Sequence, residues 1–357
     1  ARNPIPNLQF VYFTLPFWRD SLRLGQSGAM QIHYYLWQIQ AYFVARRLHR
    51  QIGFDAAHHV TFVRYSTPSL LALLPIPFNW GPVGGGEQAP RPFIKDFSSQ
   101  AKRYEKIRRV IHKVGDKDPF ARLTAQRSTV VRATTRDTAT QLYQMGAADV
   151  QIESESGLAP EEIERLNLCP LPAPAPLRFI SMGRLLHWKG FYLGIRAFAK
   201  AALPEAEYWI LGDGPELENF QALSQQRGVG DRIKFWGRLP REQTLEKLAQ
   251  SHILVHPSLH DSGGWVCLEG MAAGRPILCL DLGGPAIQVT DDTGIKIAAH
   301  TPEQVVEDMS QAMVQLAKDD DLRYRMGFAG KNLVREHYSW QVKGKKLDQL
   351  YQELCNV

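Results

Sequence analysis

The stretch His260-Asp-Ser-Gly-Gly-Trp-Val-Cys-Leu-Glu-Gly-Met-Ala-Ala-Gly274 decides the fold of this chain. The apolar run 253–256 before it predicts a buried strand. The pair Gly263-Gly264 predicts a loop whose backbone N–H groups can approach a ligand, and the apolar residues after it predict a helix. Asp261 precedes this loop, and Glu269 lies about two helical turns beyond it. One crevice could therefore offer two carboxylates, although solvated acids on an ordinary strand–loop–helix unit give the same pattern.

The second half of the chain repeats this unit. Strands are predicted at 177–182, 208–211, 233–236, 253–256 and 276–280, with a loop and a helical pattern after most of them. Such alternation predicts an α/β fold with a doubly wound parallel sheet. In these sheets ligands bind beyond the carboxyl ends of the strands, so the loops that follow the strands should meet at one rim.

The residues on that rim suit a sugar linked to a nucleoside diphosphate. Arg184 and Lys189 are two cations on one loop, which suits a diphosphate, although either one alone is more often a surface charge. Asp261 and Glu269 can accept hydrogen bonds from sugar hydroxyls. The other donor-binding candidates offer main-chain groups or close backbone approach, and they are Gly183, Gly212, Gly214, Gly237, Arg238, Leu239, Ser262, Gly263, Gly264, Trp265 and Val266.

Composition limits the class of protein. The 357 residues are sufficient for two domains, and 44% hydrophobic with 22% charged residues is an ordinary globular composition. The four cysteines form no CxxC pair, so neither a zinc site nor a disulfide framework is expected and a reducing compartment fits best. Because no apolar run reaches ~18 residues and no signal-peptide pattern is present, we expect a cytoplasmic protein.

Part of the net charge of +6 is local. One predicted helix carries six basic residues, which are Lys102, Arg103, Lys106, Arg108, Arg109 and Lys113. A solvated helix face is the simplest explanation, and contact with an anionic membrane surface or an acidic acceptor is the alternative. No nucleic-acid partner is expected, because no zinc finger, helix-turn-helix or aromatic–basic repeat is present.

The first half is less regular. A strand is predicted at 8–13, and helices or strands follow at 32–49, 56–60, 66–74, 100–113, 118–127, 128–133 and 137–145. No glycine-rich turn follows residues 8–13, although a doubly wound half normally opens with one. We therefore expect that one strand–helix unit of this domain is missing. The glycine-rich run 81–87 predicts either a loop that faces a cleft or a long connection.

Domain boundaries follow from composition. The proline-rich segment 169–176 predicts a stiff linker between an N-terminal Rossmann-like domain at 1–168 and a second domain at 177–336. Thr301-Pro-Glu-Gln304 predicts a capping box that opens a helix. Tyr338-Ser339-Trp340 marks the start of a last helix, within residues 337–357.

The second half resembles the donor domain of family 4 glycosyltransferases, which have the GT-B fold of two Rossmann-like domains that face a cleft. The matching segments occur in the order of the family, and they are Gly183-Arg184, Lys189-Gly190, 212–216, 235–237, 256–258, 261–269, 272–274 with Pro276, and 283–284. The resemblance implies retaining transfer of a sugar from a UDP- or GDP-sugar to a glycan, lipid or small-molecule acceptor. It also implies that the last helix crosses back to the first domain.

The resemblance assigns roles to single residues. Arg184 and Lys189 would neutralise the charge on the leaving diphosphate, so neither a metal nor another cofactor is expected. Glu269 would hold the ribose hydroxyls. Asp261 stands where the family has a glutamate that contacts the donor sugar, and its reach is one methylene shorter. Gly263 replaces the aromatic residue that the family usually has in this loop.

The first half departs further from the family. His59 resembles the histidine that ends a strand of the family, while Asn79-Trp80-Gly81 lies where a second histidine is usual. The acceptor-side candidates are therefore His59, Gly84, Gly85 and Glu87. Asp116-Lys117-Asp118 has the D-x-D form of metal-dependent transferases, but it lies between predicted helices rather than after a strand. The alternatives to a transferase are a nucleotide-sugar epimerase, a phosphorylase and a non-catalytic subunit that binds a nucleotide sugar.

Overall fold

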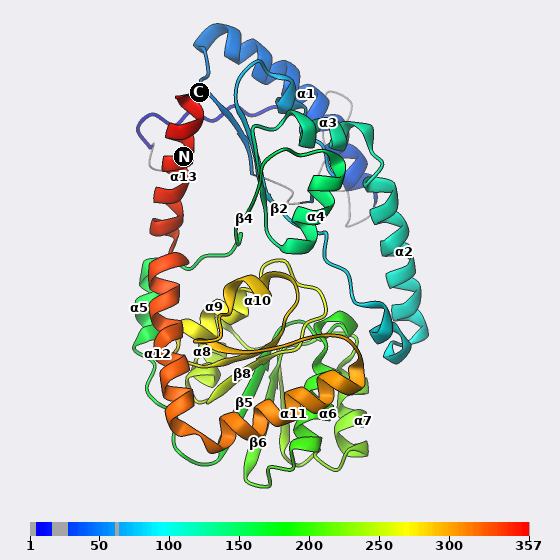
Figure 1. Cartoon of the computed structure of the whole chain (residues 1–357), viewed down its shortest axis with the longest axis vertical. Coiled ribbons are helices and arrows are strands. Elements are labelled where there is room, and N and C mark those ends of the chain that lie inside the picture. The colour runs from blue at the N-terminus through cyan, green and yellow to red at the C-terminus, as the bar shows by residue number, and fades with distance from the viewer. Residues whose placement is uncertain (1–4, 16–27, 61–63, 357) are drawn as a thin grey trace.

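The computed structural model describes residues 5–15, 28–60 and 64–356. It contains two parallel sheets, one in each half of the molecule, with helices around both (Figure 1). This arrangement confirms the prediction of an α/β protein with two Rossmann-like parallel sheets, of which the second, with its strand order reversed between β5 and β8, is doubly wound. In the described part of the chain, no helix is long and apolar enough to cross a membrane.

The second sheet positions the rim predicted above. Its strands are β5 (Leu177–Met182), β6 (Ala206–Leu211), β7 (Ile233–Gly237), β8 (Ile253–His256), β9 (Ile277–Leu280) and β10 (Gly294–Ile297). They lie in the order β10-β9-β8-β5-β6-β7, and every neighbouring pair is parallel. Because β5 and β8 are neighbours, the loops after these two strands leave the sheet side by side.

The helices of the second half cover both faces of this sheet. They are α6 (Phe191–Ala201), α7 (Leu217–Gln226), α8 (Arg241–Ala249), α9 (Trp265–Ala272), α10 (Gly283–Gln288), α11 (Pro302–Lys318) and α12 (Asp320–His337). The capping box at Thr301 is present, because its hydroxyl accepts the Gln304 N–H while the Gln304 side chain accepts the N–H of Thr301. This reciprocal cap satisfies two N–H groups that the helix leaves open.

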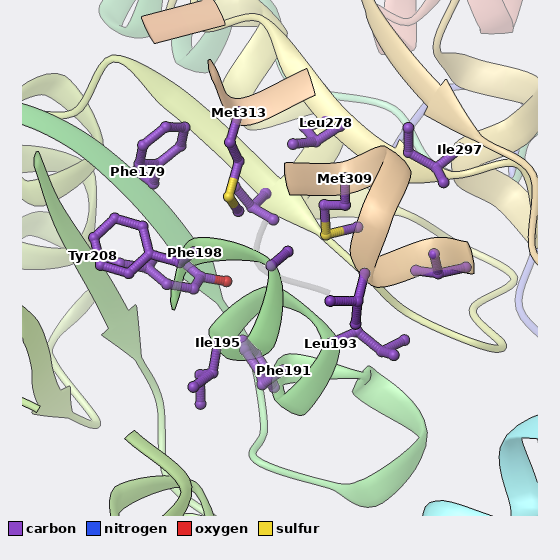
Figure 2. Packing of buried hydrophobic residues seen from close by; sticks show 14 of the residues in the cluster. Phe179, Phe191, Leu193, Ile195, Phe198, Tyr208, Leu278, Ile297, Met309 and Met313 are labelled. Carbon is purple, nitrogen blue, oxygen red and sulfur yellow. The ribbon is translucent and has the colours of Figure 1, made fainter. Parts of the chain in front are cut away.

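The core of the second half lies between β5, α6 and α11. Phe179, Phe198 and Tyr208 are fully buried, and Met313 of α11 points toward them, while Met309 of the same helix lies nearer Leu193 and Leu278 (Figure 2). Burying each of these side chains stabilises the fold by roughly 1.5–3 kcal/mol. The one polar group among them, the Tyr208 hydroxyl, lies 2.7 Å from the Ser181 hydroxyl, so it is not left without a hydrogen bond.

The first sheet has four short parallel strands. They are β1 (Ala57–His59), β2 (Phe78–Val83), β3 (Val130–Ala133) and β4 (Val150–Ile152), in that order. Around them lie α1 (Gly28–Ile52), α2 (Ser99–Gly115), α3 (Pro119–Arg127) and α4 (Arg136–Met145), whereas α5 (Pro160–Asn167) packs against α9 and α12 of the second half. Strand β4 and helix α5 were not predicted from the sequence. Strand β2 continues through the cis peptide Gly81-Pro82, so part of the predicted loop 81–87 belongs to the sheet.

Two predictions for the first half are wrong. Residues 8–13 form no strand, and Phe10 and Tyr12 are exposed. Among the described residues no strand pairs with this segment, and an isolated strand leaves its backbone groups without partners. The helix expected at 66–74 is only a 3-10 helix at Leu70–Leu73, because Pro68 and Pro75 leave too few residues for an α-helix.

The last helix, α13 (Trp340–Cys355), joins the two halves. Ser339 caps it by accepting the Val342 N–H at 3.2 Å. Figure 1 shows α13 rising from the second half along the first. Its buried residues Leu350 and Leu354 pack against Val130 of β3. This contact fixes the end of the chain on the first sheet.

Candidate functional site

Lys189 and Asp261 meet at the carboxyl edge of the second sheet. Lys189 ends a short 3-10 helix, His187–Lys189, in the loop after β5, and Asp261 lies in the loop after β8. The Lys189 Nζ is 2.5 Å from the Asp261 Oδ2, and both side chains are about one-fifth exposed. The structure thus brings together two predicted site residues that are far apart in the chain, because parallel neighbouring strands end at the same rim.

Asp261 is held by four donors. Besides Lys189, its carboxylate accepts hydrogen bonds from His256 Nε2 at 3.2 Å and from the N–H groups of Gly263 and Gly264 at 3.3 Å. Burial alone would raise the pKa of Asp261, but His256 and Lys189 hold this pKa well below its usual range. The site therefore presents a permanent carboxylate. The Lys189 ammonium and the two N–H groups around it are donors that can also form hydrogen bonds with an anionic ligand.

Glu269 lies in α9 and is 5% exposed. Its carboxylate pairs with Arg241 at the start of α8, with Nη1 2.6 Å from Oε1. Arg241 also forms an ion pair with Glu162 of α5. Burial raises the pKa of Glu269, and the adjacent Arg241 opposes this rise. Sequence reasoning missed Arg241, although a cation directly after the loop 237–240 was a signal that could have found it.

The glycines of the rim hold neighbouring loops together. The Gly183 N–H donates to the Leu211 carbonyl at 3.0 Å, and the Gly212 N–H donates to the Gly237 carbonyl at 2.8 Å. A side chain at Gly212 would collide with the Gly183 carbonyl, 1.8 Å from the ideal Cβ position. These contacts join the loops after β5, β6 and β7 into one surface. At Gly212 the loops pack so closely that a side chain would not fit, which explains why this position is a glycine.

Arg184 is exposed beside this surface. Among the described residues, its guanidinium makes no hydrogen bond or ion pair within the chain, whereas Lys189 is already paired. Arg184 is therefore the more accessible of the two predicted cations.

The acceptor-side candidates lie in different surroundings: Gly84 is at the rim, whereas Glu87 and His59 are buried. Gly84 faces the rim, because an ideal Cβ on it would lie 3.2 Å from the Ser262 Cβ. Glu87 is buried and accepts hydrogen bonds from the Gly85 N–H at 3.1 Å and from the Thr135 hydroxyl at 2.5 Å. These bonds fix the loop 84–87 to the start of α4. His59 is buried, and its Nε2 lies 3.0 Å from the Tyr34 hydroxyl.

Glu155 and Ser156, which follow β4, are functional candidates that sequence reasoning missed. The Ser262 hydroxyl donates to the Glu155 Oε1 at 3.2 Å, and the Ser156 hydroxyl donates to the Gly263 carbonyl at 2.6 Å. Burial raises the pKa of Glu155. The polar run 154–156 was the available signal, but without β4 it could not be placed at a sheet edge.

The two acids of the D-x-D sequence have structural partners. The Asp118 carboxylate caps α3 by accepting the N–H groups of Phe120 and Ala121. The Tyr65 hydroxyl donates to the Asp116 Oδ1 at 2.6 Å. Within the described ranges, no group of three or more His, Cys, Asp or Glu side chains could hold a metal ion.

Comparison with known proteins shows what the second half is similar to. Residues 172–333 match the family model Glycosyl transferases group 1. The D-inositol 3-phosphate glycosyltransferase of Corynebacterium jeikeium is 30% identical over 184 residues, which are 48% of this chain and 42% of that protein. The lipopolysaccharide core biosynthesis glycosyltransferase LpsE of Rhizobium meliloti is 32% identical over 169 residues, 47% of each. The chain thus spans under half the length of these relatives.

Solved structures share the whole architecture. Sucrose-phosphate synthase from Thermosynechococcus elongatus has a TM-score of 0.60 at 17% identity, and the match covers 92% of this chain and 82% of the synthase chain. The Anabaena protein HepE in complex with UDP has a TM-score of 0.59 at 15% identity and covers 88% and 82%. This similarity shows the GT-B fold. The names of the sequence relatives do not favour an epimerase or a phosphorylase.

Proposed function

We propose, from the match of residues 172–333 to the Glycosyl transferases group 1 model and from the GT-B fold, that the protein transfers a sugar, with retention, from a UDP- or GDP-sugar to an acceptor. The meeting of Lys189 with Asp261, beside the N–H groups of Gly263 and Gly264, carries this proposal. In the proposed division of labour, residues 1–168 bind the acceptor and residues 177–336 bind the donor. The segment 169–176 links them, and 337–357 returns to the first domain.

The leaving diphosphate would be stabilised by Lys189 and Arg184. Negative charge develops on the diphosphate as the bond to the sugar breaks, and fixed cations lower the energy of that charge. The Lys189 ammonium would exchange Asp261 for a phosphate oxygen, and the N–H groups of Gly263 and Gly264 could do the same. Asp261, thus released, would accept hydrogen bonds from the donor sugar. Two cations would then do the work that a metal ion does in other transferases.

The nucleoside would lie further along the rim. Glu269 would accept the ribose hydroxyls, and the exposed partner Arg241 would keep it ionised despite its burial. The main chain of 237–239 would flank the base. On the side of the first half, Gly84 and Glu155 approach Ser262 and would lie closest to the transferred sugar.

A glycan or a lipid-linked acceptor is supported by the names of the relatives, which include an inositol phosphate and a lipopolysaccharide core. Helix α2 adds support for a lipid surface. It exposes Ile107, Val110, Ile111 and Val114 among its basic residues. Exposed apolar residues flanked by cations are typical of helices that lie on anionic membranes. We propose a peripheral contact of α2 with the inner face of a membrane.

Thermal unfolding with UDP-, GDP- and ADP-glucose tests the proposed function. A donor present at 100 times its Kd should stabilise the wild-type chain by about 2.7 kcal/mol. Glu269→Ala should remove most of this stabilisation, because the ribose loses its acceptor, whereas Glu246→Ala on the exposed side of α8 should keep it. A shift that is unchanged in Glu269→Ala would contradict the assigned pose. Release of the nucleoside diphosphate in the same samples would distinguish a transferase from a subunit that only binds.

A further inference from the structure

The segment 89–105 of the first half lies against the second half. Phe93 and Phe97 are buried in the core of the second half, together with Leu185 and Phe191. Figure 1 shows α2 along one side of the molecule, from the level of the second sheet to the first. The end of α2 near Ser99 therefore belongs to the second half in space, although it belongs to the first half in sequence.

Glu105 is the buried acid of this contact. It is 1% exposed, and its Oε1 accepts hydrogen bonds from His187 Nε2 at 3.0 Å and from His260 Nε2 at 3.4 Å. The two histidines lie in different loops of the second half. His187 is two residues before Lys189, and His260 is directly before Asp261. One carboxylate oxygen therefore ties together the two loops that carry the ion pair of the site.

An aromatic stack reinforces the same connection. The Trp188 ring lies between Tyr104 of α2 and His260, with ring centroids 5.3 and 5.1 Å away and nearly parallel planes. Phe97 contacts the edge of His187 at 4.9 Å. The loops after β5 and β8 thus touch each other through groups that α2 orders.

The pKa of Glu105 is low, and two further contacts hold the helix that carries it. Burial would raise the pKa of Glu105, but the two histidine hydrogen bonds lower it to about 2. One turn along α2, Arg108 Nη2 donates to the Glu87 carbonyl at 2.7 Å. The Tyr65 hydroxyl holds Asp116 just beyond the end of α2. Helix α2 therefore connects the segments that follow strands of the first sheet with the loops that carry Lys189 and Asp261.

We propose that Glu105 is a positioning residue through which the first half sets the separation of Lys189 and Asp261. This inference rests on the proposed function, since the separation matters only if a sugar diphosphate binds between the two loops. Without Glu105 the His187 loop and the His260 loop keep the hydrogen bond from the Leu259 N–H to the Trp188 carbonyl at 2.8 Å, but they lose the carboxylate that fixes His187 relative to His260. The diphosphate subsite then loosens, while Glu269 and the segment 237–239, which have no contact with Glu105, stay in place.

Isothermal titration of the full chain tests this proposal. The probes are UDP, GDP and ADP, each paired with its nucleoside, which lacks the phosphates. Glu105→Gln should weaken binding of the preferred nucleoside diphosphate about tenfold, as expected for the loss of one charge-assisted hydrogen bond, and leave the nucleoside unchanged. Glu336→Gln, an exposed glutamate of α12, is the matched control and should bind both as the wild type does.

A second variant guards against misfolding. His260→Phe keeps a ring on Trp188 but removes the hydrogen bond to Glu105, so it should reproduce the selective loss, and nucleoside binding equal to that of the wild type would show that this variant is folded. Equal weakening of nucleoside and diphosphate in both variants would show a merely structural role and overturn the proposal. Unchanged diphosphate binding in Glu105→Gln would overturn it as well. If the wild-type chain binds none of the nucleotides, the proposed function itself is wrong.

Discussion

Gly190→Ala tests the geometry that brings Lys189 to Asp261. Gly190 is buried at the start of α6 with φ of 67°, a left-handed conformation that costs other residues roughly 1–2 kcal/mol. An ideal Cβ at this position would lie 1.9 Å from the Pro257 carbonyl oxygen. The carbonyl belongs to the backbone between β8 and Asp261, so no side-chain rotation relieves the clash. Overpacking of this kind costs a further ~1–3 kcal/mol.

Gly228→Ala is the matched control for this prediction. Gly228 has nearly the same φ, 69°, but an ideal Cβ on it meets nothing within 4 Å. Both substitutions carry the cost of the left-handed backbone, and only Gly190→Ala carries the clash. Urea unfolding of the two variants should therefore show Gly190→Ala to be less stable by ~1–3 kcal/mol.

The same variant should also bind nucleoside diphosphates more weakly, because relief of the clash moves the Lys189 loop away from the Asp261 loop. Equal losses of stability in Gly190→Ala and Gly228→Ala would refute the close contact of these loops. Our explanation of how Lys189 is held beside Asp261 would then be wrong.

Two further predictions concern acid stability and membranes. Burial lowers the pKa of His252 to about 4, so its contribution to stability is fully present above pH 6.5 and is lost as the pH falls toward 4. This loss should reach about 2 kcal/mol, since water screens part of the charge. In urea unfolding, the free energy of unfolding of His252→Gln should therefore fall by that much less than the wild type's between pH 6.5 and pH 4, and equal losses in the two proteins would contradict the prediction. Ile111→Glu should abolish sedimentation of the chain with phosphatidylglycerol vesicles if α2 contacts a membrane, and sedimentation equal to that of the wild type would speak against the contact.

The sequence was sufficient for much of the second half. Each of its strands except β10 was predicted, because buried parallel strands are short apolar runs bounded by loop residues. The meeting of Lys189 with Asp261 also followed, since the carboxyl ends of parallel strands share one edge. The pairing of Glu269 with Arg241 did not follow, because a helix start and a helix interior from different units came together only through tertiary packing.

The first half shows where local patterns fail. Residues 8–13 have the composition of a strand, but a strand also needs a second strand with which to pair. The sequence of the segment itself does not say whether such a partner is present. Strand β4 has only three residues, too few to give a period. Glu105 is an acid within a basic helix, and the sequence analysis assigned it no role. Its link to His187 and His260 depends on how the two halves lie against each other, which no spacing in the sequence records.

A crystal structure of this chain with the best-binding of UDP, GDP and ADP would test most directly whether the rim is a donor site. We predict phosphate oxygens within hydrogen-bonding distance of the Lys189 ammonium and the ribose at Glu269. A nucleotide bound elsewhere would contradict the assignment. The cavity of about 490 Å³ beside Cys169, Arg275 and Lys331, at the opposite ends of the strands, is one such place.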